Sequence, residues 1–339
     1  MTKMTEDAGE APDAVARMLS ANAAGCAALG KKLRGAPPPL AITCARGSSD
    51  HAATFAKYLI ETRLGVPTMS FAPSVASIYG ARLRVAGALF IVISQSGRSP
   101  DLIASAQAAR DAGALVVTIV NAEESPLARV GQICLPLHAG RERSVAATKS
   151  FIASLAAVLQ IVAHWGERKE LAAALDNLPG NLDAAAALDW SPAENAFAKA
   201  DDMLVIGRGL GFAIAQEAAL KLKETSVIHA EPFSAAEVEH GPMALVREGF
   251  PILVFSQQDE TRAGVQDLVS NLRGKGGRVF VAEQGPAAPE RLPVVTGVDP
   301  ALALVTMIQS FYFLANAVAL ARGRDPDDPP HLRKETETL

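Results

Sequence analysis

The sequence predicts an α/β chain made of two copies of one domain, each a doubly wound parallel sheet flanked by helices. Short apolar strand runs alternate with helical stretches along most of its 339 residues. A strand, a glycine turn and a helix recur late in the chain at a fixed spacing. Apolar residues make up 49% and aromatic residues only 5%, which provides a large core and favours a helix-rich fold over an all-β one.

The first copy follows a leading segment, residues 1–36, which we expect to be helical and to end at the prolines of residues 37–39. Apolar runs at residues 40–45, 90–93 and 115–119 predict its strands. Because these runs are apolar throughout rather than alternating, the sheet is expected to be covered by helices on both faces.

The second copy repeats these elements in order. Arg46 and Arg208 mark matching strand–glycine turn–helix units, 162 positions apart (208 − 46). Ser94 and Ser256, each followed by Gln after an apolar run, have the same separation. Long apolar helices are expected to close the copies, at residues 148–165 and 300–321.

Breaks in this pattern at Pro179-Gly180 and Ser191-Pro192 place the joint between the copies. The predicted segments are a helical segment (1–36), a first domain (37–190), a second domain (191–325) and a C-terminal tail (326–339).

Charge and cysteine usage exclude several classes of protein. The net charge of −4 shows no basic surplus of the kind that nucleic-acid binding needs. Cys26, Cys44 and Cys134 are odd in number and far apart, so neither a disulfide framework nor a zinc site is predicted. The first residues lack an apolar signal core, and we expect a cytoplasmic protein.

Residues 301–321 carry no charge over a length that can cross a bilayer. They include Thr306, Gln309, Ser310 and Asn316, and no other segment resembles a span. The favoured interpretation is a helix buried in a core or in a subunit interface.

Residues 94–101, SQSGRSPD, follow a predicted strand directly and form the strongest candidate for a binding site. Backbone N–H groups at a helix start, together with serine hydroxyls, suit a phosphate. The alternative is a serine-rich helix cap without a ligand. Ser48 and Ser49, after the first strand, either add donors to the same ligand or form an ordinary turn. The counterpart of SQSGRSPD in the second copy, residues 256–260, is acidic and lacks the glycine, so that copy is expected to have lost the phosphate site.

Glu217, Lys221 and Glu224 lie on one face of a predicted helix, at i, i+4 and i+7. A solvated salt-bridge ladder is the usual meaning of this pattern. A carboxylate held beside a lysine in packed surroundings is instead suited to proton transfer.

Residues 229–242 concentrate histidines and glutamates and end in His240-Gly241-Pro242. Their spacing fits no standard metal signature, and His240 is a candidate either for acid–base chemistry or for a structural turn. Residues 144–149 form either a lid or a helix cap. The proline-rich tail carries Arg333 and Lys334 and is either disordered or placed at a site.

In combination, these motifs resemble the sugar isomerase (SIS) family. The matching segments cover nearly the whole chain in order: residues 47–49 (GSS), 94–101, 143–151 (RSVAATKSF), 217–231 (EAALKLKETSVIHAE), 237–242 (EVEHGP) and the Lys334 tail. The likeness is greatest to the isomerase part of glucosamine-6-phosphate synthases and to standalone aminosugar-phosphate deaminases. It implies two flavodoxin-like SIS domains, a homodimer whose subunits share the active site, and no metal or cofactor.

The resemblance also implies roles for individual residues. Glu224 matches the base that moves a proton between sugar carbons 2 and 1, and Lys221 matches a lysine that supports it. His240 matches the ring-opening histidine, which a neighbouring subunit contributes, and Lys334 matches a tail lysine near the sugar carbonyl. The substrate-contacting candidates are Ser48, Ser49, Ser94, Gln95, Ser96, Ser99, Val145 and Arg333.

Two departures from the synthase pattern matter. Thr2 stands where the synthases have a catalytic cysteine that begins a glutaminase domain, so forward synthesis with glutamine is not expected. Arg98 replaces an acidic residue of the synthases, and SGRSPD is more similar to the deaminase branch.

These features predict an enzyme that converts glucosamine-6-phosphate and water to fructose-6-phosphate and ammonia. The alternatives are a phosphosugar isomerase, a deaminase for another substrate such as galactosamine-6-phosphate or a fructosamine phosphate, and a non-catalytic phosphosugar sensor. No nucleic-acid or membrane partner is expected.

Overall fold

The computed structural model describes residues 1–334, which form two compact units. The sheet-1 unit comprises residues 11–142, 149–179 and 333–334, and the sheet-2 unit comprises residues 1–10, 143–148 and 180–332. The units exchange short segments, so their limits differ from the predicted segment ends at 36, 190 and 325. The last five residues of the predicted tail lie outside the described residues.

The sheet-1 unit contains a five-stranded, wholly parallel sheet in the order β2-β1-β3-β4-β5. Its central strands have buried apolar side chains on both faces, as the continuous apolar runs predict. The strands are β1 (Ala41–Cys44), β2 (Thr68–Ser70), β3 (Leu89–Ser94), β4 (Leu115–Val120) and β5 (Ile133–Pro136).

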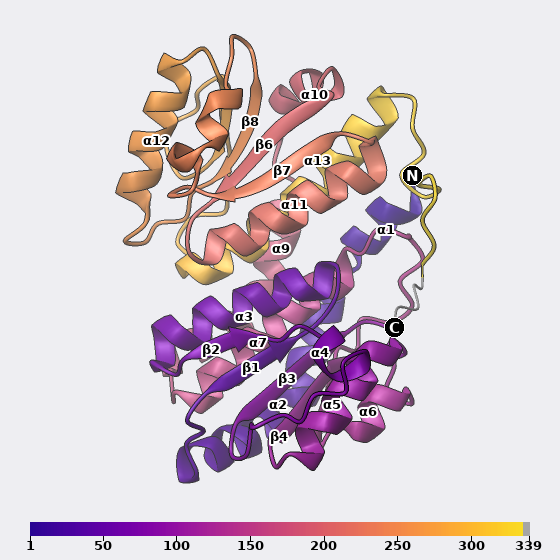
Figure 1. Ribbon diagram of the computed structural model, residues 1–339. Coiled ribbons are helices and arrows are strands. Elements are labelled where there is room, and N and C mark those ends of the chain that lie inside the picture. Colours follow the sequence, from indigo (N-terminus) through magenta and orange to yellow (C-terminus); the bar gives the residue numbers. More distant parts are fainter. Residues whose placement is uncertain (335–339) are drawn as a thin grey trace. The chain divides into compact units, whose positions relative to one another are not determined.

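Helices cover both faces of this sheet (Figure 1). On one face, α2 and α3 contact the strands and α7 packs against both helices, while α4, α5 and α6 form the other layer. The leading segment of the chain is two helices, α1 and α2, rather than one. The bounds are α1 (Lys3–Gly9), α2 (Ala11–Gly35), α3 (Ser48–Leu64), α4 (Ser74–Ser77), α5 (Pro100–Asp111), α6 (Pro126–Val130) and α7 (Lys149–Trp165).

The sheet-2 unit repeats this architecture with a parallel sheet in the order β10-β9-β8-β6-β7. Because each strand occupies the place of its counterpart in sheet 1, the predicted tandem α/β fold is confirmed. The strands are β6 (Asp202–Gly207), β7 (His229–Ser234), β8 (Pro251–Phe255), β9 (Arg278–Ala282) and β10 (Arg291–Leu292).

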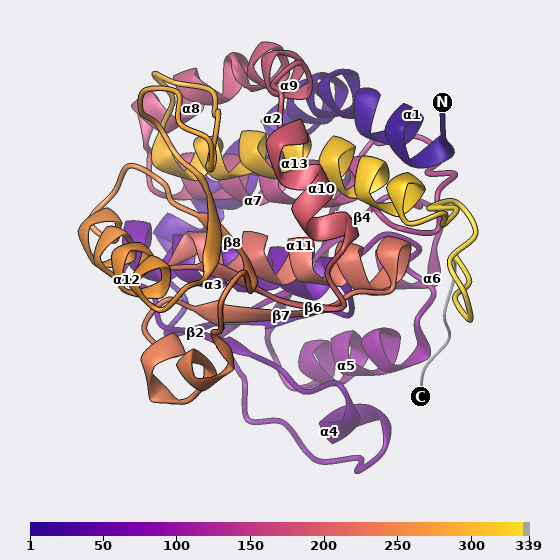
Figure 2. The ribbon, with the colours of Figure 1, turned by 90° about the horizontal axis from the view of Figure 1, so that it is seen from above.

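On one side of sheet 2, α11 packs against β6 and β7, α13 lies beside it with Phe311 against Phe255 of β8, and α10 places Phe197 against Phe280 of β9, while α12 covers the other side (Figure 2). Two 3₁₀ turns, η1 and η2, follow β7. The bounds are α9 (Leu178–Ala186), α10 (Ser191–Ala198), α11 (Leu210–Ser226), η1 (Val238–His240), η2 (Pro242–Leu245), α12 (Arg262–Gly274) and α13 (Pro300–Ala321). Helix α8 (Lys169–Asp176), which precedes them, packs against α7 in the sheet-1 unit.

Helix α13 is the uncharged segment that is long and apolar enough to cross a membrane, and 83% of its most apolar window is buried within the structure. Its buried polar side chains find partners inside the sheet-2 unit. Thr306 donates to the carbonyl of Ala303, Gln309 to that of Ala8 and Ser310 to that of Ala185. Of the two expected settings, a core or a subunit interface, the structure shows burial within the core of the sheet-2 unit.

Each sheet changes its winding direction between its first and third strands in chain order, β1 and β3 in sheet 1 and β6 and β8 in sheet 2. Ligands of doubly wound folds bind at the carboxyl ends of the strands beside such a point. The serine turn after β3 and the acidic turn after β8 both lie there.

The cysteines give a first prediction. Burial raises the pKa of Cys26 and of Cys44 to about 12 and also raises the pKa of Cys134. At pH 8 only about one in 10⁴ of the first two thiols is ionised, so they react slowly. We expect iodoacetamide to leave Cys26 and Cys44 unmodified in the native protein and to label them on denaturation, as measured by mass spectrometry. Rapid native labelling of either thiol would contradict this.

Candidate functional site

The serine turn after β3 is a compact loop that folds back on itself. The hydroxyl of Ser94, the last residue of β3, accepts a hydrogen bond from the Gly97 N–H at 3.1 Å. The Ser96 hydroxyl accepts one from the Arg98 N–H at 3.3 Å. Gly97 adopts a left-handed φ of +63°, and a Cβ at this position would lie 2.1 Å from the hydroxyl of Ser125. Only glycine permits this turn.

Helix α5 begins directly after the turn, with Ser99 as N-cap and Pro100 in its first turn. Among residues 1–334, the Ser99 side chain makes no capping hydrogen bond to the helix. Gln95, Ser96 and Ser99 are half-buried at the edge of the sheet. The capping interpretation therefore does not account for Ser99, and the turn retains polar groups that can bind an anion.

The turn after β1 lies at the same edge, because β1 and β3 are neighbouring parallel strands. Gly47 precedes α3, and Ser48 and Ser49 are half-buried in its first turn. Arg46 donates from Nε to Oδ2 of the buried Asp101 carboxylate at 2.8 Å. Its terminal nitrogen Nη2 lies 2.8 Å from the same oxygen. This charge-assisted pair joins the two turns. Sequence analysis did not single out this pair, although Asp101 is the last residue of the 94–101 motif and Arg46 comes just before Ser48 and Ser49.

The second group of predicted residues lies on α11 in the sheet-2 unit. Lys221 and Glu217 are fully buried, and the ammonium of Lys221 lies 3.6 Å from Glu217 and in hydrogen-bond contact with Glu224. The hydroxyl of Tyr312, from α13, donates to Glu217 at 3.3 Å. A solvated ladder is excluded by this burial. Glu224 is the most exposed member of the cluster, with 19% of its side chain accessible.

The arrangement on α11 is chemically suited to proton transfer. The Glu224 carboxylate is partly solvent-exposed and lies next to the buried ammonium of Lys221. It therefore has a fixed positive charge on one side and can be reached by a small molecule on the other. Neighbouring Lys223 donates to the carbonyl of Ala230, and burial lowers its pKa against the opposing effect of Glu231 and Glu224.

The buried pair yields a stability prediction. Glu217→Ala removes a fully buried carboxylate from beside Lys221 and leaves the buried Tyr312 hydroxyl without this acceptor, which costs about 3–5 kcal/mol in free energy of unfolding. The matched control is Asp202→Ala, which removes the exposed partner of Arg247 and is expected to cost less than about 1 kcal/mol. Urea titration measures both, and equal losses would show that the Glu217–Lys221 pair does not behave as a buried one.

His240 ends η1 and is exposed, as are His229 and Glu231. Gly241, with a φ of +148°, follows His240 and begins the turn into η2. In the part of the chain that the structure describes, no group of three or more His, Cys, Asp or Glu side chains is arranged to hold a metal ion.

The tail that carries Lys334 is anchored by a buried carboxylate, Glu142, which precedes the Val145 segment in the chain. Glu142 accepts hydrogen bonds from the Ser150 hydroxyl at 2.6 Å and from the Lys334 ammonium at 3.1 Å. It also accepts from the Ser150 N–H in the first turn of α7. Glu142 thus fixes the tail lysine in the sheet-1 unit and stabilises the helix start. Sequence analysis did not identify it.

Val145 itself is half-buried in a segment that belongs to the sheet-2 unit, and Arg333 is exposed. The predicted residues thus fall into two sets. The sheet-1 unit contains Ser48, Ser49, Ser94, Gln95, Ser96, Ser99, Arg333 and Lys334, and the sheet-2 unit contains Val145, Lys221, Glu224 and His240.

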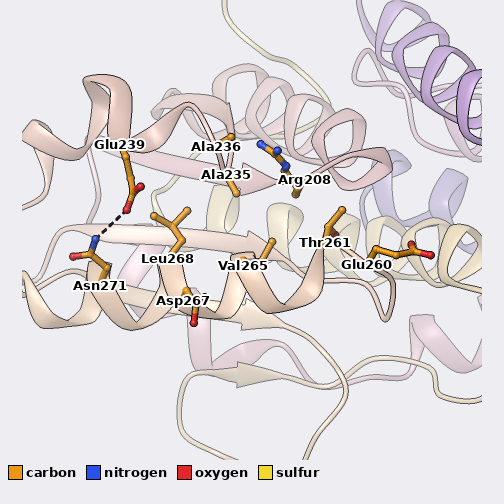
Figure 3. Close-up of a pocket in the computed structure, with 11 residues that line it drawn as sticks. Arg208, Ala235, Ala236, Glu239, Glu260, Thr261, Val265, Asp267, Leu268 and Asn271 are labelled. Carbon is orange, nitrogen blue, oxygen red and sulfur yellow. Dashed lines mark hydrogen bonds between the residues drawn. The ribbon is translucent and has the colours of Figure 1, made fainter.

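The second copy has a cavity of about 590 Å³ between the turns that follow β6, β7 and β8 and helix α12 (Figure 3). Arg208 and Thr261 lie at one end, and Glu239, hydrogen-bonded to Asn271 at 3.2 Å, lies at the other. Its remaining charged lining residues, Glu260 and Asp267, are acidic. In the adjoining turn, the Asp259 carboxylate accepts from the N–H and hydroxyl of Thr261. These acidic side chains disfavour an anion in this cavity.

These features define a tandem-repeat α/β protein with a serine-rich turn after the third strand of its first repeat. The SIS domain family model matches residues 40–164 and 196–282, one match in each repeat. Together these matches cover more than half of the 339 residues. The chain belongs to the SIS domain family.

Known proteins are similar over most of the chain. The glutamine–fructose-6-phosphate aminotransferase (isomerizing) of Haemophilus influenzae is 34% identical over 85% of this chain. The chain spans about half the length of that curated relative, 50%. A solved structure from Silicibacter pomeroyi DSS-3, provisionally assigned as a phosphosugar isomerase, is 42% identical over 96% of this chain and all of the other, with a TM-score of 0.91.

A second solved structure is the C-terminal domain of the glucosamine-fructose-6-phosphate aminotransferase of Francisella tularensis. It is 27% identical, covers 97% of this chain and 98% of its own, and has a TM-score of 0.86. The match to this domain agrees with the resemblance to the isomerase part of the synthases that the motifs indicate.

Proposed function

We propose that this protein is an aminosugar-phosphate deaminase that converts glucosamine-6-phosphate and water to fructose-6-phosphate and ammonia. The observation that carries the proposal is the buried Glu217–Lys221–Glu224 cluster with its partly open carboxylate. A purely phosphate-binding protein has no need of such a group. The serine turn after β3 supplies the anion-binding donors that a sugar phosphate requires.

In the proposed mechanism, Ser94, Gln95, Ser96 and Ser99 bind the phosphate, with Ser48 and Ser49 as further donors. His240, contributed by the neighbouring subunit of a homodimer, opens the pyranose ring. Glu224 then removes the proton from carbon 2 of the open-chain aldose and delivers it to carbon 1.

During this transfer the amine loses a proton as oxygen 1 gains one, which gives a ketimine at carbon 2. Water adds to the ketimine, and the carbon–nitrogen bond breaks to release ammonia and the ketose phosphate. Lys334 and Lys221 supply positive charge, Lys334 at the sugar carbonyl and Lys221 at the base. We infer a cytoplasmic protein, since its substrates are phosphorylated metabolites.

A plain aldose–ketose phosphosugar isomerase is the second candidate. The 42% identity to the protein from Silicibacter pomeroyi provisionally assigned that activity favours it. Arg98 in the serine turn favours the deaminase instead, because the segment SGRSPD is more similar to the deaminase branch than to the synthases.

The test is to incubate the purified protein with glucosamine-6-phosphate and to follow ammonia and fructose-6-phosphate together. Equal amounts of both products support the deaminase. Isomerisation of a neutral hexose phosphate without ammonia release supports the second candidate. Binding of sugar phosphates without turnover of any of them would overturn both enzyme proposals.

A further inference from the structure

We propose that Asp7 is a positioning residue, and that helix α1 is the support on which the Val145 segment and the C-terminal tail are held for the substrate. This inference rests on the proposed function, because it assumes that Val145 contacts the sugar and that Lys334 approaches its carbonyl. The structural anchoring itself is independent of that assumption.

The carboxylate of Asp7 is fully buried and holds the start of the Val145 segment. One of its oxygens accepts hydrogen bonds from the N–H groups of Arg143 and Ser144, at 2.7 and 2.8 Å. The other accepts from Nε of Arg143 at 3.3 Å. Because one carboxylate binds two successive backbone N–H groups, it fixes the direction of the chain in the two residues that precede Val145.

The Arg143 guanidinium extends this anchor over the second half of α1 and its C-cap residue, Glu10. One terminal nitrogen lies 2.9 Å from Glu6, and the other lies 2.9 Å from Glu10. Hydrogen bonding to Asp7, followed by the charges of the three carboxylates, raises the pKa of Arg143. Two carboxylates of α1 and that of its C-cap residue thus hold a single arginine of the segment.

The opposite end of α1 holds the tail. The Asp327 carboxylate accepts from the N–H groups of Lys3 at 2.7 Å and Met4 at 2.9 Å, in the first turn of α1. Lys334 follows seven residues after Asp327 in the chain (334 − 327). The helix itself is fixed to buried α13 by hydrogen bonds from Thr2 to Asn316 and from Gln309 to the Ala8 carbonyl.

These contacts connect two segments that are remote in sequence but that the proposed mechanism needs together. Neither Asp7 nor Asp327 is a catalytic residue, since neither is expected to touch the substrate. Because a small misplacement of a positioned group reduces binding or rate strongly, loss of either carboxylate is expected to change kinetics without removing any reacting group.

The experiment compares three variants of the full chain, with glucosamine-6-phosphate as the probe. Asp7→Asn keeps the side-chain shape but removes the charge that accepts two N–H groups. We expect KM to rise by at least about ten-fold with kcat nearly unchanged. Asp327→Asn, which loosens the tail instead, is expected to lower kcat by about ten-fold with a smaller change in KM.

The matched control is Glu10→Gln, which removes a carboxylate from the same arginine but leaves the backbone contacts intact. It is expected to leave KM and kcat at wild-type values. A second readout does not depend on activity: hydrogen exchange at the Arg143 and Ser144 amides should accelerate in Asp7→Asn and not in Glu10→Gln.

The outcomes separate the two proposals. Unchanged exchange in Asp7→Asn would overturn the anchoring. Faster exchange with unchanged KM would overturn the link to the substrate, while the proposed function would stand. If the wild-type protein neither binds nor turns over glucosamine-6-phosphate, the proposed function fails first, and the role of α1 in positioning for this substrate fails with it. If all three variants lower the melting temperature equally and none changes KM or kcat relative to the others, α1 has only a structural role.

Discussion

Replacing Glu224 with glutamine is expected to lower kcat for ammonia release by about 10³-fold or more, in line with the contribution of a positioned acid–base group. Glutamine keeps the length and shape of the side chain but cannot take a proton from carbon 2. Lys221 retains Glu217 as a carboxylate neighbour, so the helix is expected to stay folded. The affinity for the sugar phosphate should stay within about three-fold of the wild type, since the serine turn is untouched.

The measurement combines steady-state kinetics with calorimetric binding of glucosamine-6-phosphate. Glu231→Gln is the control, because Glu231 is an exposed carboxylate on β7 close along the chain and has no proposed chemistry. It should retain wild-type kcat. Wild-type turnover in Glu224→Gln would rule out Glu224 as the base. A loss of binding equal to the loss of rate would instead make Glu224 a binding residue.

Much of the fold was predictable because its signals are local. The apolar runs around β1, β3 and β4 need only their own residues to predict buried parallel strands, and the repeat reinforces each of them. The same holds for the serine turn, since its hydroxyls, glycine and proline are adjacent. The leading segment was less accurately predicted: it divides at Glu10 into two helices that belong to different units.

The parts of the candidate site that sequence analysis missed depend on partners far apart in the chain. Asp7 meets Arg143 across 136 positions, and Glu142 meets Lys334 across 192. The α11 cluster is covered by α13, whose Tyr312 contacts Glu217 from 95 residues away in the chain. Helical spacing states which side chains share a face, but not what covers that face.

The serine turn gives the second large effect, through Gly97→Ala. Two costs are expected. A left-handed φ costs alanine about 1 kcal/mol relative to glycine. In addition, the new methyl group would lie 2.1 Å from the Ser125 hydroxyl, so the turn must move. A displaced turn loses several aligned phosphate donors at once, and we expect KM for the sugar phosphate to rise by about 10²-fold.

Gly87→Ala is the matched control, because it separates backbone strain from displacement of the turn. Gly87 also has a left-handed φ, +76°, but a Cβ there would meet nothing within 4 Å. This variant should lose about the same 1 kcal/mol of stability from strain, with KM unchanged. If both variants raise KM equally, general destabilisation explains the effect. If Gly97→Ala lowers stability while KM stays at the wild-type value, the phosphate binds elsewhere than at the turn after β3.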